Sequence, residues 1–96
     1  MSDEGTVVIR PEERFDFQAY RPFREAYELE LNKDSVKRLV IDMQAVKYID
    51  SAALGMLLLL RDKALARSKQ VELRNLHGVV KDVFEVANFH KLFTIS

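Results

Sequence analysis

The sequence places a serine, Ser51, where an extended apolar segment, 46–49, changes into a run of good helix formers. A hydroxyl at the start of a helix can accept a hydrogen bond from a free backbone N–H group and act as an N-cap. The positive end of the same helix can instead hold a phosphate carried by that hydroxyl, beside the carboxylate of Asp50. The local sequence leaves both interpretations open, a plain cap and a modified serine.

The helix capped by Ser51 is predicted to run from Ala52 to about Ser68, a length of roughly 25 Å. Its first nine residues, 52–60, carry no charged or polar side chain. Only one side of a helix can face a sheet, so the other apolar side must be covered by another element or form a contact surface. A phosphate on Ser51 would put negative charge beside Asp50 and disrupt an apolar contact there, which would make the serine a switch.

Other kinds of chemistry find little support in the sequence. The three glycines are too scattered to cradle the phosphates of a nucleotide, and no nucleophile elbow surrounds Ser51. His77 and His90 lack the spacing of metal ligands, and we predict a turn or helix start for the first and a surface position for the second. The sequence has no cysteine. We therefore predict a protein that is not an enzyme and binds neither metal nor cofactor.

The composition favours one small domain over residues 1–96, with residues 1–5 disordered. Fifteen basic residues balance fifteen acidic ones, so no bulk attraction to nucleic acid or to an anionic membrane is implied. The longest apolar run, 52–60, is about half the length of a membrane span. The acidic, polar N-terminus is unlike a secretory signal, so a bacterial-type cytoplasmic location is predicted.

The N-terminal half predicts a strand followed by a helix. Residues 6–10 are rich in β-branched side chains, and Pro11 ends the strand or places it at an edge. The helix begins near Ala19 or Tyr20, because Pro22 is tolerated only in a first turn. Its apolar stripe has helical spacing and consists of Tyr20, Phe23, Tyr27 and Leu31.

The C-terminal half continues the alternation of strand and helix. The contiguous apolar residues of 38–43 predict a buried central strand, parallel to the first one because a helix connects them. A third strand is predicted at 70–76 and a short helix at 79–87, ending at Asn88. Residues 92–95 can form a last short strand. This order predicts a layered α/β domain in which Asp16, Asp42 and Asp50, each following a strand, gather beside Ser51 at one end.

The segment from Val40 to Leu57, Val-Ile-Asp-Met followed by Tyr-Ile-Asp-Ser-Ala-Ala-Leu-Gly-Met-Leu, resembles the signature region of the STAS domain of bacterial anti-sigma factor antagonists. Residues 9–16 and 73–93 resemble other parts of that domain. The resemblance implies a layered α/β fold with a mixed, mostly parallel sheet of about four strands and helices packed on it. This chain leaves little room for the family's usual first strand, so its sheet can expose an edge that pairs with a second copy in a homodimer.

The resemblance also implies roles for individual residues. Ser51 matches a serine that is phosphorylated by a kinase that doubles as the anti-sigma factor, and a serine phosphatase reverses the modification. Ala52 removes the second hydroxyl that is usual in the family, which leaves one target. The positions that match partner-binding residues are Asp16, Asp42, Asp50, Ala53, Gly55 and Met56.

Two functions remain open from the sequence. In one, the chain is an anti-sigma factor antagonist that binds its partner when Ser51 is unphosphorylated and releases it when Ser51 is phosphorylated. In the alternative, it is a constitutive STAS subunit of a membrane-lipid transport complex, and Ser51 is a structural helix cap.

Overall fold

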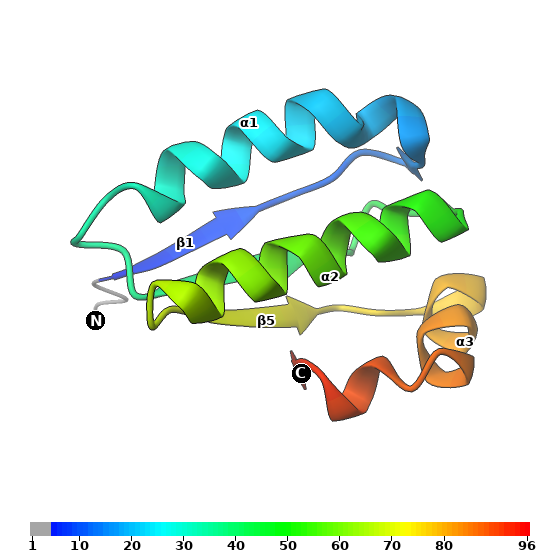
Figure 1. Ribbon diagram of the computed structural model, residues 1–96. Helices are drawn as coiled ribbons and strands as arrows, with labels where there is room; N and C mark the ends of the chain where they lie inside the picture. The colour runs from blue at the N-terminus through cyan, green and yellow to red at the C-terminus, as the bar shows by residue number, and fades with distance from the viewer. Residues whose placement is uncertain (1–4) are drawn as a thin grey trace.

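A four-stranded sheet forms the centre of the structure, a computed structural model that describes residues 5–96 (Figure 1). Its strand order is β1-β3-β5-β6, and every neighbouring pair is parallel. The predicted α/β fold with a mostly parallel sheet is confirmed, although no antiparallel pair is found within residues 5–96. The strands are β1 (Thr6–Ile9), β3 (Arg38–Asp42), β5 (Gln70–Arg74) and β6 (Thr94–Ile95).

The predicted central strand is β3, which lies between β1 and β5. Leu39 and Ile41 point into the main hydrophobic core, whereas Val40 points to the opposite face, since successive side chains of a strand alternate. All three residues are without exposed surface. This burial on both faces explains why their apolar run is contiguous and not alternating.

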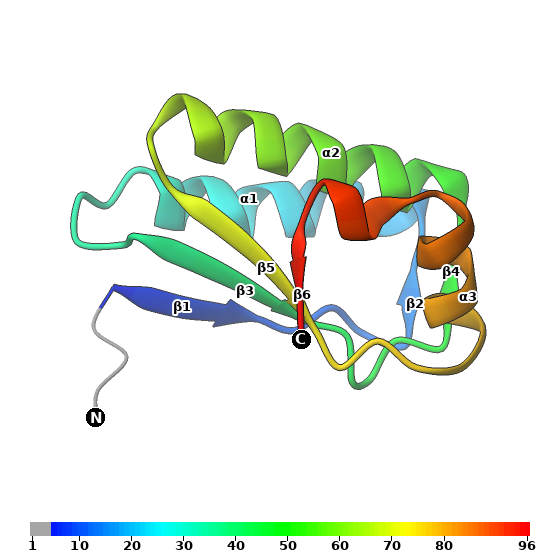
Figure 2. The same ribbon diagram turned by 90° about the horizontal axis from the view of Figure 1, so that it is seen from below.

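Helices α1 (Tyr20–Leu31) and α2 (Ser51–Ala66) lie together on one face of the sheet (Figure 2). In α1, Phe23, Tyr27 and Leu31 are buried as predicted. Tyr20 is 41% exposed, so its prediction as a core residue was wrong. It lies in the first turn of α1, where its neighbours are surface residues of α2 and not the sheet.

Three basic side chains join the C-terminal end of α2 to the C-terminal end of α1. Lys63 of α2 donates to the Glu28 carboxylate of α1 at 2.6 Å. Arg67 donates to the backbone carbonyl of Leu31 at 2.9 Å, and Lys69 donates to the carbonyl of Lys33. Arg67 thereby satisfies a carbonyl that the end of α1 leaves without a partner, and the three bonds together fix α1 against α2 at that end.

Several short elements complete the fold. Helix α3 (Gly78–Val86) is followed by Asn88, whose φ of 60° confirms the predicted helix end, and by the 3₁₀ helix η2 (Phe89–Lys91). Strand β6 confirms the predicted last strand. Gly5 was predicted as disordered, but its carbonyl accepts hydrogen bonds from Lys37 and Arg38. Residues 1–4, which carry the rest of that prediction, lie outside the described residues.

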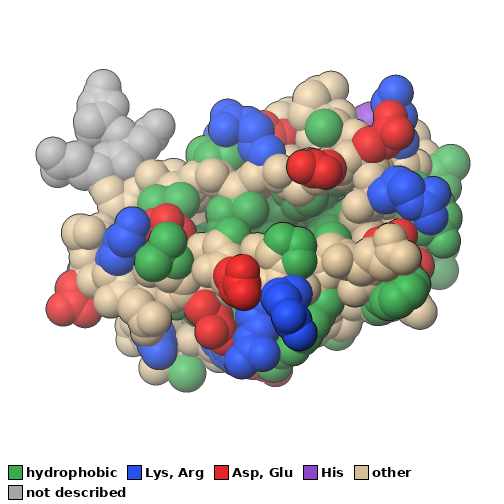
Figure 3. Space-filling view, turned by 90° about the horizontal axis from the view of Figure 1, so that it is seen from above, with side chains coloured by type: hydrophobic (Ala, Val, Ile, Leu, Met, Phe, Trp, Pro, Cys, Tyr) green, Lys and Arg blue, Asp and Glu red, His purple; other side chains and the backbone are tan. Residues whose placement is uncertain are grey.

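Strand β1 is an edge strand, since within residues 5–96 it pairs only with β3. A hollow of about 450 Å³ lies between the segment that follows β1 and the first turns of α1, with Ile9 and Phe23 among its lining residues. Figure 3 looks onto this side of the molecule and shows a depression with hydrophobic side chains on its floor and charged ones along its rims. Pairing of this edge with a second copy stays a prediction.

The core position of α2 predicts a large difference between two leucines of the same helix. Leu57 is wholly buried and Leu65 is 55% exposed. Leu57→Ala is expected to lower the free energy of unfolding by about 2–5 kcal/mol, because it leaves a cavity under α2. Leu65→Ala is the matched control and should cost less than about 1 kcal/mol. Urea denaturation of both variants measures this, and equal losses would contradict the assignment of the buried face.

Candidate functional site

The start of α2 is capped by Asp50 and not by Ser51. Asp50 has extended backbone angles, and its Oδ1 accepts a hydrogen bond from the backbone N–H of Ala53 at 3.0 Å. The prediction of Ser51 as the cap was therefore wrong by one residue. Aspartate caps as well as serine does, and here the extended residue that precedes the helix is the aspartate.

Ser51 is consequently the first residue of α2 and is exposed. Within residues 5–96, its hydroxyl makes no hydrogen bond to another residue. Since the cap is supplied by its neighbour, this hydroxyl has no structural role at the helix start. It is accessible for modification or for contact with a partner.

A second, two-stranded sheet brings Asp16 to Asp50. Strand β2 (Arg14–Phe15) pairs in parallel with β4 (Tyr48–Ile49), in the register Arg14 with Tyr48. Asp16 then accepts a hydrogen bond from the N–H of Gln18 at 3.1 Å and caps the 3₁₀ helix η1 (Phe17–Ala19). The N–H of Phe17 donates to Oδ2 of Asp50 at 3.3 Å. The two aspartates therefore lie in one hydrogen-bonded assembly beside Ser51.

Asp42 belongs to a different network at the end of β3. Its carboxylate accepts hydrogen bonds from the side chain of Asn75 at 2.9 Å and from the N–H of Gln44 at 3.0 Å, and it pairs with Arg10 at 3.4 Å. These partners follow β5, β3 and β1, so Asp42 ties the ends of three strands together. None of its contacts reaches Asp16, Asp50 or Ser51, and its predicted role in partner binding stays a prediction.

The three predicted partner-binding residues of α2 differ in their exposure. Gly55 is exposed, and a Cβ added there would meet no atom within 4 Å, so the fold itself does not require a glycine. Met56 is buried apart from a small part of its surface. Ala53 is wholly buried, so its methyl group faces the core and offers no contact to a partner. The phase of the helix, set by its start at Ser51, turns Ala53 inward.

An apolar hollow lies beside the exposed face of this helix start. It has a volume of about 460 Å³ and is formed by η1, the start of α1 and the first turns of α2. Phe17 contributes a ring that is 65% exposed, and the sequence analysis did not single it out. The one signal in the sequence that could have indicated Phe17 as a site residue is its position directly after Asp16. The lining residues are Phe17, Tyr20, Ala52, Gly55, Met56 and Leu59, and we call this surface the α2 hollow.

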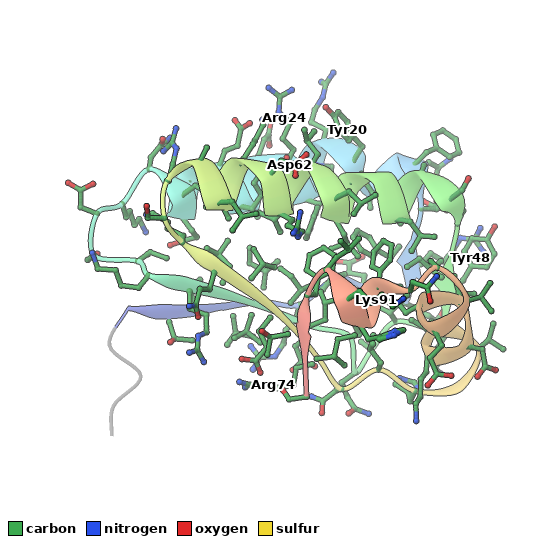
Figure 4. All side chains as sticks on the ribbon, turned by 60° about the horizontal axis from the view of Figure 1, so that its bottom comes forward. Tyr20, Arg24, Tyr48, Asp62, Arg74 and Lys91 are labelled. Atoms are coloured by element: carbon green, nitrogen blue, oxygen red, sulfur yellow. The ribbon has the colours of Figure 1, made fainter. Side chains whose placement is uncertain are left out.

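Arg14 is the second residue that the sequence analysis missed. Its guanidinium lies over the ring of Tyr48, 4.4 Å from the centroid, and pairs with the Asp16 carboxylate at 3.4 Å. Figure 4 shows Tyr48 at the end of the molecule where α2 begins. A cation thus contacts Asp16, and the next residue, Phe17, donates to Asp50.

The histidines make no hydrogen bond to Asp16, Asp50 or Ser51 within residues 5–96. His77 is the residue before α3, as predicted, and its Nε2 lies 2.9 Å from the carbonyl of Gln44. His90 is exposed. In the part of the chain that the structure describes, no group of three or more potential ligand side chains could hold a metal ion. No helix in that part is long and apolar enough to cross a membrane.

The STAS domain family model matches residues 2–96. The chain belongs to the STAS family. A STAS-domain containing protein of Pseudomonas aeruginosa (strain UCBPP-PA14) is 41% identical to it over 95 residues, which are 99% of this chain and 92% of the relative. The family assignment made from the segment around Ser51 is thereby confirmed.

Solved structures share the fold at low sequence identity. A proposed anti-sigma factor antagonist from Thermotoga maritima aligns with a TM-score of 0.85 at 20% identity, over 99% of this chain and 80% of that one. The anti-sigma factor antagonist SpoIIAA in its unphosphorylated form aligns with a TM-score of 0.76 at 21% identity, over 100% and 83%. The murine anion transporter Slc26a9 aligns with a TM-score of 0.82 at 18% identity, over 99% of this chain and 16% of that one. The STAS fold therefore occurs both in regulators and in transporters.

Exchange of the capping residue should destabilise the protein more than exchange of the serine. Asp50→Ala removes the acceptor of the Ala53 and Phe17 N–H groups, so the free energy of unfolding should fall by about 1–2 kcal/mol. Asp50→Asn keeps a capping oxygen and should retain most of the stability. Ser51→Ala should change it by less than about 0.5 kcal/mol. A larger loss in Ser51→Ala than in Asp50→Ala, measured by urea denaturation, would contradict the cap assignment.

The network around Asp42 predicts a dependence of stability on pH. The hydrogen bond from Asn75 and that from Gln44, with a smaller effect of Arg10, hold the pKa of Asp42 below its ordinary value. A lowered pKa in the folded state contributes stability above the unfolded pKa, and this stability is lost as the pH falls below about 4. Asn75→Gly should raise the pKa of Asp42, and glycine suits the left-handed backbone of that position, φ 64°. Titration of the Asp42 carboxyl carbon by NMR tests this, and an unchanged pKa would refute it.

Proposed function

We propose that this chain is an anti-sigma factor antagonist of the partner-switching kind. Its unphosphorylated form binds a kinase-type anti-sigma factor or a similar regulator through the exposed start of α2 and the α2 hollow. The kinase transfers a phosphoryl group from a nucleoside triphosphate to the Ser51 oxygen, which loses its proton, and the complex dissociates. A serine phosphatase hydrolyses the phosphate and restores binding. The chain is the substrate in this cycle and not the enzyme.

The observation that carries the proposal is the free hydroxyl of Ser51. Because Asp50 caps the helix, the serine is not needed to start α2, and its exposed side chain stands beside an apolar surface. A serine that only supported the fold would be expected to bond to the backbone of its own helix. The position is therefore better suited to a reversible modification than to a structural hydroxyl.

The charge that such a modification adds is large for this surface. A phosphoserine carries a charge of about −1.5 to −2 at neutral pH. Here it would lie next to the carboxylate of Asp50 and close to that of Asp16, both of which repel it. An apolar partner surface packed on the α2 hollow would have to desolvate this charge. Only about 1.4 kcal/mol is needed for each tenfold loss of affinity, so one phosphate is sufficient for release.

The alternative is a constitutive STAS subunit of a membrane-lipid transport complex. The fold itself does not separate the two functions, since a transporter domain aligns as well as the antagonists do. The role of Ser51 separates them. In the alternative, Ser51→Asp should leave assembly unchanged, because an exposed carboxylate at a helix start is tolerated.

Tagged Ser51→Ala and Ser51→Asp proteins, expressed at equal levels in the native cells, test the proposal. Ser51→Ala should retain its regulator permanently, whereas Ser51→Asp should retain at least tenfold less, measured by quantitative mass spectrometry of the captured proteins. Phe17→Ser in the Ser51→Ala background should also release the regulator if the α2 hollow is the docking surface. Lys81→Ser, an exposed change on α3, is the matched control. Equal capture by the alanine and aspartate proteins would instead support the constitutive subunit.

A further inference from the structure

The exposed side chain of Arg14 contacts two partners, Asp16 and Tyr48. Its guanidinium is 3.4 Å from the Asp16 carboxylate and lies 4.4 Å from the centre of the Tyr48 ring. The Arg14 side chain is 65% exposed, and the Tyr48 residue is 45% exposed. The Asp16 side chain is only 8% exposed, but it also accepts the N–H of Gln18, so it keeps a partner if the exposed guanidinium moves to a stronger acceptor nearby.

The pairing of β2 with β4 places Arg14 on the strand beside the one that leads into Ser51. Arg14 is opposite Tyr48, and Phe15 is opposite Ile49, so the chain direction carries both strands toward Asp16 and Asp50. Arg14 and Asp16 lie on the same face of their strand, because alternate residues share a face, and their side chains meet. Ser51 directly follows Asp50. Asp50, the residue before Ser51, lies two residues beyond Tyr48, about 7 Å along the chain at about 3.3 Å per residue, which is within the reach of an arginine side chain.

Two other cations near this end pair with carboxylates outside the group formed by Asp16 and Asp50. Lys47 pairs with Glu13 at 3.5 Å, and Arg10 pairs with Asp42 at 3.4 Å. The free N–H groups of the first turn of α2 can also bind a phosphate, but Asp50 already occupies the N–H of Ala53. A phosphate on Ser51 would therefore meet the carboxylates of Asp50 and Asp16, and Arg14 is the cation that already contacts one of these two residues.

We propose that Arg14 is the phosphate-sensing residue of this site: when Ser51 is phosphorylated, the guanidinium leaves Asp16 and Tyr48 and binds the phosphate oxygens. A guanidinium binds a phosphate through two parallel hydrogen bonds, which are stronger than its present contacts. The face of the Tyr48 ring that the guanidinium covers then becomes exposed to solvent. Modification thus alters the surface of the β2–β4 sheet as well as the charge at the start of α2. This inference rests on the proposed modification of Ser51.

The test uses protein in which phosphoserine is incorporated at position 51 during synthesis, so that no natural kinase is needed. The second pKa of the phosphate, ordinarily about 6, is measured by ³¹P NMR. In the unsubstituted protein it should lie about half a unit or more below its value in Arg14→Gln, because a bound cation favours the dianion. Lys47→Gln is the matched control, and it should leave this pKa within about 0.2 units of the unsubstituted value.

The ring proton signals of Tyr48 give a second readout, because they report the departure of the guanidinium and not only a change of charge at a distance. Phosphorylation should shift the ring proton signals of Tyr48 in the unsubstituted protein and leave them unchanged in Arg14→Gln. Arg14→Lys should restore part of the pKa difference, since it keeps the charge but not the two parallel hydrogen bonds. Equal phosphate pKa values in the unsubstituted and Arg14→Gln proteins, or equal effects of Lys47→Gln and Arg14→Gln, would overturn the inference. That result would not affect the proposed phosphorylation of Ser51. Absence of phosphate on Ser51 in cells would refute the phosphorylation, but it would not refute the ability of Arg14 to bind a phosphate at that position.

Discussion

The carboxylate of Asp50 is the group on which the arrangement of the site depends. One of its oxygens caps α2 through the N–H of Ala53, and the other accepts the N–H of Phe17 in the segment before α1. Both segments that carry the site are thus joined to one side chain. The capping bond from the N–H of Ala53 fixes where α2 begins. It thereby turns Ser51 toward solvent and Ala53 toward the core. The exposed serine is a consequence of the cap that precedes it.

The long elements could be predicted from the sequence because their patterns extend over many residues. Phe23, Tyr27 and Leu31 recur at helical spacing and are buried together, and Leu39 to Ile41 form a run that only a central strand would need. Strands β2 and β4 could not be predicted in this way. Each has two residues, too few to show a period, and they form only because segments far apart in the sequence pair with one another.

The site was predicted in outline but not in detail. The sequence indicated Asp50 and Ser51 at a helix start, yet both residue types cap helices, and only the extended backbone of Asp50 and its bond from the N–H of Ala53 identify the aspartate as the cap. That shift of one residue decides which side chains of the first turn are exposed. An exposed Phe17 could not be predicted, because an aromatic side chain is usually buried. The role of Arg14 could not be predicted either, because its partners Asp16 and Tyr48 come together only through the β2–β4 pairing.

The central claim is that Ser51 is reversibly phosphorylated. Intact-mass and peptide mass spectrometry of the protein isolated from its own cells tests it most directly. We expect a phosphoryl group on Ser51 in a fraction of molecules that changes with growth condition. An unmodified Ser51 under every condition, in protein that co-purifies as a stable complex, would contradict the switch and support a constitutive subunit.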